Sequence, residues 1–181
     1  MTAGARRKSP AKRLSRSARL AARVKRRPND LGAIYDWFDA MVEENGRSAA
    51  VARLSAFSRR TKAWGPPLAL GYCLFGLGRT KAGVEALRQA YDRNPSEKTL
   101  YALSGGLLVT DRADEAVELL LNHDGSKKIT ARPLVNLANA YLARGDRVKA
   151  EAALRRIAAA EREDWRELVD SAWQRLAWTG S

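Results

Sequence analysis

The sequence predicts an all-α protein, a right-handed α-solenoid of about four helix-turn-helix repeats followed by a C-terminal capping helix. Three observations lead to this fold class. Apolar residues recur at spacings of three and four, small residues recur every 33 or 34 positions, and turn-forming residues separate the apolar segments. The alternation of period two that indicates half-buried strands is absent.

The repeat is clearest in the second helix of each unit. Four small residues lie 33, 33 and 34 positions apart: Ala50, Gly83, Ala116 and Ala150. Each is followed four positions later by a leucine: Leu54, Leu87, Leu120 and Leu154. A constant period of this length is typical of stacked helical hairpins, in which each unit buries its apolar face against the next.

The first helix of each unit carries large residues at helical spacing, which places them on one face. The four sets are Ile34, Trp37, Phe38 and Met41; Pro67, Leu70, Gly71 and Leu74; Leu100, Leu103, Ser104 and Leu107; and Leu134, Leu137, Ala138 and Tyr141. We therefore expect these residues to pack against the second helices and against neighbouring units.

Turn residues mark the borders of the helices, because glycine allows positive φ and Asp or Asn can cap a helix. They are Asn45-Gly46, Gly78, Asp111 and Gly145-Asp146 inside the units and Asn94-Pro95-Ser96 between two units. Asp164 is expected to open the last helix, whose three tryptophans are expected to serve mainly in packing: Trp165, Trp173 and Trp178. The predicted boundaries are repeats at about 31–63, 64–96, 97–130 and 131–164 and a cap helix at 165–178.

These motifs resemble the tetratricopeptide repeat (TPR) family. The residues that match its pattern best are Leu70, Gly71, Gly78, Leu87, Ala90 and Pro95 in the second unit and Leu137, Ala138, Tyr141, Gly145, Ala150 and Leu154 in the fourth. The resemblance covers residues 31–178, although Trp37-Phe38 stand where the pattern has Leu-Gly and only Pro95 matches its closing proline.

The resemblance implies a non-enzymatic protein that holds a peptide segment or helix in a concave groove formed by the first helices. Carried over by position, the groove is lined by Tyr35, Asp39, Val42, Leu68, Tyr72, Phe75, Tyr101, Leu108, Val135, Asn139 and Leu142. Some family members clamp a C-terminal carboxylate, but only Asn136 and Asn139 match such a site here, so this function is not expected.

The residue inventory argues against catalysis and metal binding. The single histidine, His123, excludes most histidine-based chemistry, and the single cysteine, Cys73, excludes an internal disulfide or a cysteine metal cluster. We expect His123 at the surface and Cys73 buried beside a turn. No catalytic residue, metal ligand or cofactor site is predicted.

The formal net charge of +13 is concentrated at one end of the chain. Residues 1–28 hold eleven of the 33 basic residues and none of the 20 acidic ones. They are Arg6, Arg7, Lys8, Lys12, Arg13, Arg16, Arg19, Arg23, Lys25, Arg26 and Arg27. The segment is predicted to be a disordered or conditionally helical arm, and residues 29–181 the repeat domain.

Several functions of the arm remain open at this point. Its unopposed cations suit RNA, DNA, a ribonucleoprotein or an acidic protein. A weakly amphipathic membrane-surface helix, a transit peptide and a solvated tail are the other interpretations.

The sequence thus predicts a scaffold or adaptor that binds a protein in its groove and an acidic partner through the arm. The alternative is a nucleic-acid- or ribosome-associated accessory factor in which the arm is the main binding element. No apolar segment is long enough to span a membrane. The expected location is a bacterial-type cytoplasm, or mitochondria if the arm is a transit peptide.

Overall fold

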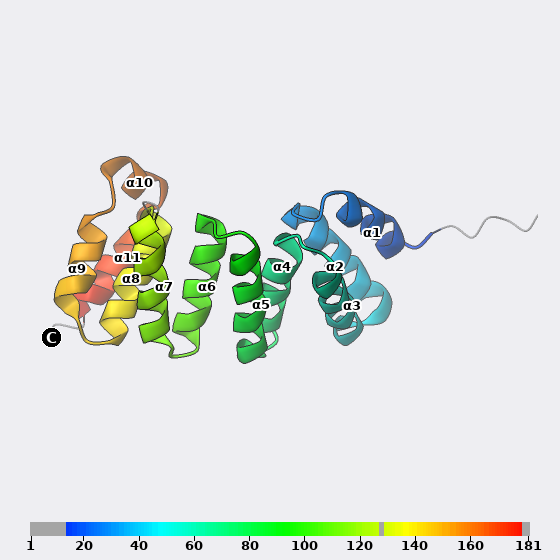
Figure 1. The fold of residues 1–181 in the computed structure, drawn as a ribbon, viewed down its shortest axis with the longest axis horizontal. Coiled ribbons are helices and arrows are strands. Elements are labelled where there is room, and N and C mark those ends of the chain that lie inside the picture. Colours follow the sequence, from blue (N-terminus) through cyan, green and yellow to red (C-terminus); the bar gives the residue numbers. More distant parts are fainter. Residues whose placement is uncertain (1–13, 127–128, 179–181) are drawn as a thin grey trace, which may run out of the picture.

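The computed structural model describes residues 14–126 and 129–178, and within these ranges the side chains of residues 126, 159 and 160 are not described. All the secondary structure of the described residues is helical (Figure 1). The helices are α1 (Arg16–Arg26), α2 (Leu31–Asn45), α3 (Arg47–Arg60), α4 (Gly65–Phe75), α5 (Thr80–Arg93), α6 (Glu97–Val109), α7 (Ala113–Ser126), α8 (Ala131–Ala143), α9 (Arg147–Arg155), α10 (Ala159–Asp164) and α11 (Arg166–Trp178).

The helices form hairpins that stack side by side in sequence order, which confirms the predicted solenoid of helical hairpins. The pairs are α2/α3, α4/α5, α6/α7 and α8/α9, and each pair also contacts the next. Helix α1 packs on α2 at one end, and α11 packs on α8 and α9 at the other. In the view of Figure 1, α3 and α5 lie in front of α2 and α4, so this view shows the face of the second helices.

The predicted turns adopt the expected backbone conformation. Gly46, Gly78 and Gly145 have φ values of 81°, 69° and 75°, in the region that glycine tolerates without a Cβ clash. Asp111 takes a φ of 57° at the equivalent turn of the third hairpin, as short polar residues sometimes do. Each hairpin is therefore closed by a residue with positive φ just before its second helix.

The second and third hairpins pack closely because glycines stand where side chains would clash. A Cβ built on Gly71 of α4 would lie 2.4 Å from Cδ2 of Leu87, and one on Gly83 of α5 would lie 2.7 Å from Cδ2 of Phe75. On α6, a Cβ at Gly106 would lie 2.9 Å from Cδ1 of Leu87. Leu87 and Phe75 thus occupy the volume that these three glycines leave open.

The first hairpin departs from the family pattern in a way that the packing explains. Trp37 of α2 is buried and meets Phe57 of α3 edge to face, with ring centroids 5.6 Å apart and an interplanar angle of 84°. The edge-to-face arrangement is favourable for aromatic pairs. Two aromatic side chains therefore fill the space between α2 and α3.

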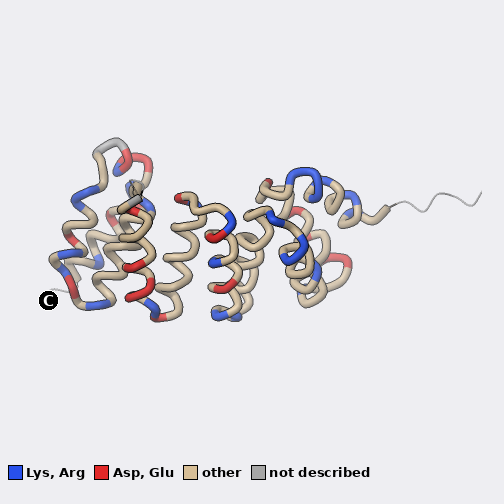
Figure 2. The backbone as a smooth tube through the Cα atoms, viewed as in Figure 1, with Lys and Arg blue, Asp and Glu red and all other residues tan. Residues whose placement is uncertain are grey.

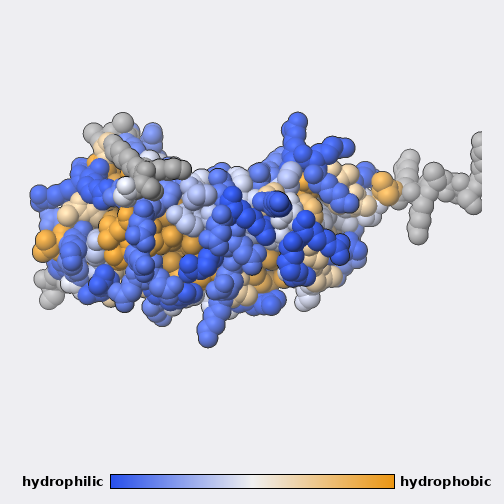
Figure 3. All heavy atoms as spheres, in the orientation of Figure 1, coloured by the Kyte–Doolittle hydropathy of each residue, from blue (hydrophilic) through white to orange (hydrophobic). Residues whose placement is uncertain are grey.

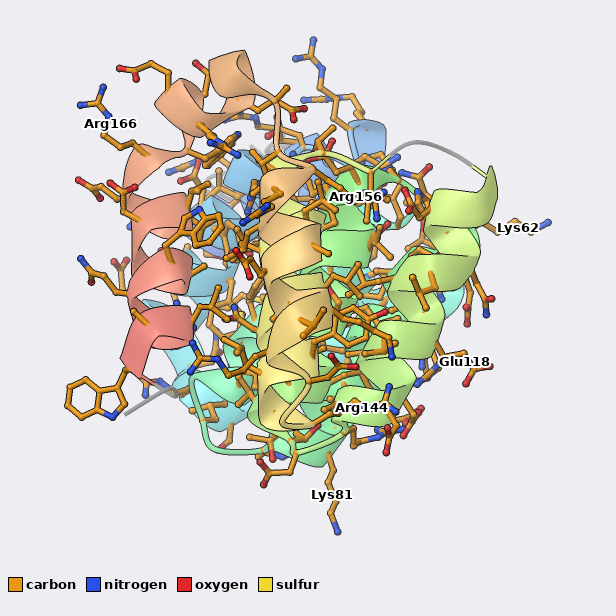
Figure 4. All side chains as sticks on the ribbon, turned by 90° about the vertical axis from the view of Figure 1, so that its left-hand side faces the viewer. Lys62, Lys81, Glu118, Arg144, Arg156 and Arg166 are labelled. Atoms are coloured by element: carbon orange, nitrogen blue, oxygen red, sulfur yellow. The ribbon has the colours of Figure 1, made fainter. Side chains whose placement is uncertain are left out.

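Charged side chains surround the stack, and some link neighbouring hairpins. Viewed along the long axis, Lys62, Lys81, Glu118 and Arg166 project outward (Figure 4). Arg144, at the end of α8, pairs with Asp114 of α7 at 3.0 Å. Such ion pairs are exposed, so they contribute little to stability beside the buried apolar contacts.

The expectation that the tryptophans of the last helix serve mainly in packing is wrong for two of them, because Trp165 is 42% and Trp178 is 83% exposed.

Two further expectations for single residues are wrong. His123 is buried rather than at the surface, and its Nδ1 lies 3.0 Å from the hydroxyl of Tyr91, which brings α7 against α5. Asp164 does not open the last helix but ends α10, because the amide of Trp165 continues the helical pattern by donating to the carbonyl of Glu161. Helix α11 begins at Arg166.

Candidate protein-binding face and basic end

The first helices α2, α4, α6 and α8 present most of the predicted groove residues on their accessible face. Asp39 and Tyr72 are exposed, and a further set is half-buried: Tyr35, Val42, Phe75, Tyr101, Leu108, Asn139 and Leu142. Leu68 and Val135 are corrections, because both are 1% exposed and belong to the hydrophobic core, where they pack between helices. They cannot contact a ligand on this face.

An apolar pocket of about 450 Å³ opens between α4 and α6. Helices α2 and α4 pack directly on each other, as do α6 and α8, whereas α4 and α6 contact each other less. Tyr72 and Phe75 form one wall, Leu87 lies below, and the α6 wall is Tyr101, Ala102, Gly105, Gly106 and Val109. The two adjacent glycines leave part of the α6 wall without side chains, so the pocket reaches the helix backbone.

Arg132 of α8 stands beside this pocket with its guanidinium held between two aromatic rings. Its Cζ lies 3.9 Å from the ring centroid of Tyr101 and 4.8 Å from that of Trp165. Such stacking fixes the plane of the guanidinium and leaves its N–H edge available. No carboxylate among the described residues lies within 4.0 Å of Arg132, although Glu163, Asp164 and Glu167 line the same pocket of about 660 Å³.

Tyr101 is shared by both pockets, so the apolar pocket and the arginine stack form one continuous surface. We call it the central site, made of Tyr72, Phe75, Tyr101, Gly105, Val109, Arg132 and Trp165. Arg132, Gly105, Val109 and Trp165 were not among the predicted groove residues. The spacing of the repeats identifies equivalent positions, but it does not show where two first helices separate.

Burial raises the pKa of three groups of this face: Tyr35, Tyr72 and Cys73. It raises the pKa of Tyr35 to about 12, and it raises the pKa of the Cys73 thiol to about 11 with a smaller contribution from the charge of Asp39. Burial also raises the pKa of Tyr72, while the charge of Arg132 acts in the opposite direction. Near pH 7 these groups are hydrogen-bond donors, and Cys73 is not a thiolate nucleophile.

The two asparagines that resembled a carboxylate clamp make contacts within the protein. The Asn136 amide is buried and donates to the Tyr101 carbonyl at 3.0 Å and to the Ser104 hydroxyl at 2.8 Å. The Asn139 side-chain oxygen accepts from Arg175 at 3.2 Å. Asn136 therefore fixes α8 against α6.

The second half of the basic arm forms α1 and docks on α2 through residues of its first turn. Glu44 accepts hydrogen bonds from the Ser17 amide at 2.9 Å and from the Ser17 hydroxyl at 2.5 Å. Val24 is buried against α2. Arg16, Arg19, Arg23, Lys25 and Arg26 lie on this helix and Arg27 follows it, whereas Arg6, Arg7, Lys8, Lys12 and Arg13 lie outside the described residues.

We expect Glu44→Ala to weaken the docking of α1. The hydrogen bonds from the Ser17 hydroxyl and amide hold the pKa of Glu44 below its ordinary value, so the stabilisation is present above the unfolded-state pKa and disappears as pH falls through the folded one. Amide hydrogen exchange should show several-fold lower protection in α1. Glu43→Ala removes only an exposed pair with Arg16 and serves as the control, so equal decreases in both variants would contradict this role.

Within residues 14–126 and 129–178, no three His, Cys, Asp or Glu side chains gather closely enough to hold a metal ion. None of the helices described is both long and apolar enough to cross a membrane.

The chain is similar in structure to several solved TPR proteins. A thermophilic TPR protein from Thermus thermophilus has a TM-score of 0.59 at 19% identity, over 86% of this chain and 87% of that one. MamA has a TM-score of 0.58 at 19% identity, over 82% and 86%. A set of nearly identical TPR-like repeats from Podosopora anserina has a TM-score of 0.56 at 19% identity, over 85% and 82%.

No protein-family model matches the chain, and none of the curated proteins compared with it matches significantly. Identities of 19% establish the fold and nothing finer. The helical hairpins, the 33–34-residue period and the solved neighbours agree on that fold. The chain is a TPR-like helical repeat protein.

Proposed function

We propose that this protein is a non-enzymatic scaffold that binds a segment of another protein on the face of its first helices. The observation that carries the proposal is the central site, where an apolar pocket of about 450 Å³ adjoins an arginine without a carboxylate partner among the described residues. Binding energy in protein interfaces is concentrated in a few anchors that enter such pockets, and tyrosines and arginines are enriched around them.

The chemistry of the site suggests the kind of segment that it would hold. A bulky apolar side chain would fill the space between Tyr72, Phe75 and Val109. Polar groups of the same segment would meet the hydroxyls of Tyr72 and Tyr101 and the N–H edge of Arg132. A segment with one large apolar residue next to uncharged polar ones therefore fits both halves of the site, because Glu163, Asp164 and Glu167 line the pocket beside Arg132.

Peptides selected from a random display library on the full chain should share a bulky apolar residue. Gly105→Leu places a side chain in the pocket, and Val109→Gln makes its rim polar, so we expect each to weaken peptide binding about tenfold or more. Val148→Gln is the control for Val109→Gln, because the two valines are similarly exposed, at 79% and 68%. Val148 lies on α9, outside the pocket, whereas Val109 lines it. Fluorescence anisotropy measures each affinity.

If peptides bind all three variants as tightly as the unaltered chain, the central site is not the binding site. Gly105 is a suitable position for the test because the nearest atom to an added Cβ is Nδ2 of Asn136, at an ordinary 3.5 Å. A Cβ at this position therefore has room, and the rest of the leucine side chain occupies the pocket that Gly105 lines.

A second candidate function is that of a nucleic-acid- or ribosome-associated accessory factor that uses the basic arm. It is supported by the charge of residues 1–28, which contain eleven Lys and Arg and no acid. Neutralising Arg19, Lys25 and Arg26 on α1 tests both candidates. The scaffold predicts that peptide binding survives, and the accessory factor predicts loss of nucleic-acid binding.

A further inference from the structure

A second basic region lies inside the repeat domain, outside residues 1–28. The 40 residues from Asn45 to Val84 contain seven Lys and Arg and no Asp or Glu. They include the whole of α3, whose four arginines are all exposed: Arg47, Arg53, Arg59 and Arg60. Lys62 follows in the connection to α4 and projects outward from the stack (Figure 4).

Comparison with α9, the equivalent second helix of the fourth hairpin, shows that this pattern is not general. Helix α9 carries three cations, and two of them are paired. Lys149 pairs with Asp146 at 2.8 Å, and Arg155 pairs with Glu151 at 2.6 Å. No carboxylate among the described residues lies within 4.0 Å of the α3 arginines. The charge of α3 is therefore unopposed, whereas most of that on α9 is locally neutralised.

Most acids of α2 are already engaged by α1, and Asp39 lies exposed on the first-helix face. Glu43 pairs with Arg16, and Asp30 and Asp36 both pair with Arg23. The remaining cations of α1 have no carboxylate within 4.0 Å in the described chain: Arg19, Lys25 and Arg26. Figure 2 shows the result, with Lys and Arg dense on α1 and α3 at one end of the second-helix face.

The same end of the molecule exposes few large apolar side chains. Its exposed large apolar residue is Leu14, at the start of the described chain, and the others belong to α4, α6, α7, α9 and the C-terminal helices. On this face the surface over α3 is mostly hydrophilic, and apolar side chains gather instead between α7 and α9 (Figure 3). Polar, strongly positive surfaces are typical of nucleic-acid interfaces, whereas protein interfaces have apolar centres.

We propose that the exposed cations of α3, together with those of α1 at the same end of the stack, form a binding surface for the phosphate backbone of a nucleic acid. Arginine predominates in it, and a guanidinium can bind two phosphate oxygens at once. Arg53 and Arg60 are two helical turns apart, about 10 Å along the axis, so they would contact successive parts of one strand. The surface lies on the second helices, so it leaves the central site accessible to a protein segment.

The test measures binding of the full chain to a fluorescently labelled 20-nucleotide single-stranded RNA. Fluorescence anisotropy gives the affinity at several salt concentrations. In one variant Arg53, Arg59 and Arg60 are changed to Gln; in the control Arg147, Lys149 and Arg155 are changed to Gln, with the same decrease in charge on the equivalent helix. We expect the α3 variant to bind about tenfold more weakly at low salt. The slope of its affinity against salt concentration, on logarithmic scales, should fall by about 0.7 for each phosphate that is no longer neutralised.

The control variant should stay within about twofold of the unaltered chain, because the proposal requires unopposed charge at one place. Equal weakening of both variants would overturn the proposal, since it would indicate diffuse attraction to total charge. Unchanged binding of the α3 variant would also overturn it and would leave the arm as the binding element.

A competition experiment distinguishes the class of partner. Displacement of the RNA by polyglutamate, added at the same concentration of negative charges as the RNA, would overturn the proposal and indicate an acidic protein instead of a nucleic acid. Peptide binding at the central site is measured separately, so failure of one proposal does not imply failure of the other.

Discussion

Replacing Trp37 by alanine is expected to lower the free energy of unfolding by about 3–5 kcal/mol. The side chain is 8% exposed and packs edge to face on Phe57, so its removal eliminates buried apolar area, an aromatic pair and a link between α2 and α3. Because neighbouring hairpins support each other, the substitution should also loosen α1 and α4, which pack against α2.

Urea denaturation followed by circular dichroism measures this effect. Trp178→Ala is the matched control, because Trp178 is 83% exposed near the end of the described chain, and we expect a change within about 0.5 kcal/mol. A Trp37 variant that unfolds at the same urea concentration as the control would show that the first hairpin contributes little to the stability of the stack.

Two glycines on first helices should respond to alanine in opposite directions. At Gly71 the new Cβ would lie 2.4 Å from Cδ2 and 2.6 Å from Cγ of Leu87, whose other methyl group already lies against Gly106. Leu87 therefore has little room to move, and we expect Gly71→Ala to lower the free energy of unfolding by about 1–3 kcal/mol. At Gly105 the nearest atom is 3.5 Å away, and the gain in helix propensity should raise stability by about 0.5–1 kcal/mol.

Thermal unfolding of the two variants side by side checks this pair, since both substitutions add one methyl group to a first helix. A fall in stability for Gly105→Ala, or a rise for Gly71→Ala, would mean that α4, α5 and α6 are packed differently from the arrangement described above. The pair also matters for function, because Gly105 forms part of the open wall of the central site.

The two proposed surfaces lie on different helices of each hairpin. The central site is built mainly on α4, α6 and α8, the first helices, whereas the basic surface is built on α1 and α3. A TPR-like stack presents two sets of helices to two sides, which allows one chain to hold two partners at once. The proposals together describe a scaffold that brings a protein segment close to a nucleic acid.

The sequence alone was sufficient to predict the hairpins, their period and their turns. These features depend on residues close together in the chain, such as the apolar spacing of three and four, the small residues at Gly83 and Ala116, and the turns at Gly78 and Gly145. The charge imbalance of residues 1–28 was also evident from composition. Local patterns of this kind determine helices and their order.

Only the tertiary structure decided which residues form sites. Arg132 stacks between Tyr101 and Trp165, which lie about one repeat before and after it, and Asn136 donates to Ser104, 32 positions away. Leu68 and Val135 occupy predicted groove positions, yet the packing of neighbouring hairpins buries them. The cause is physical, because burial and pocket shape depend on the distance between helices from different repeats. That distance is set by contacts between side chains that lie far apart in the sequence.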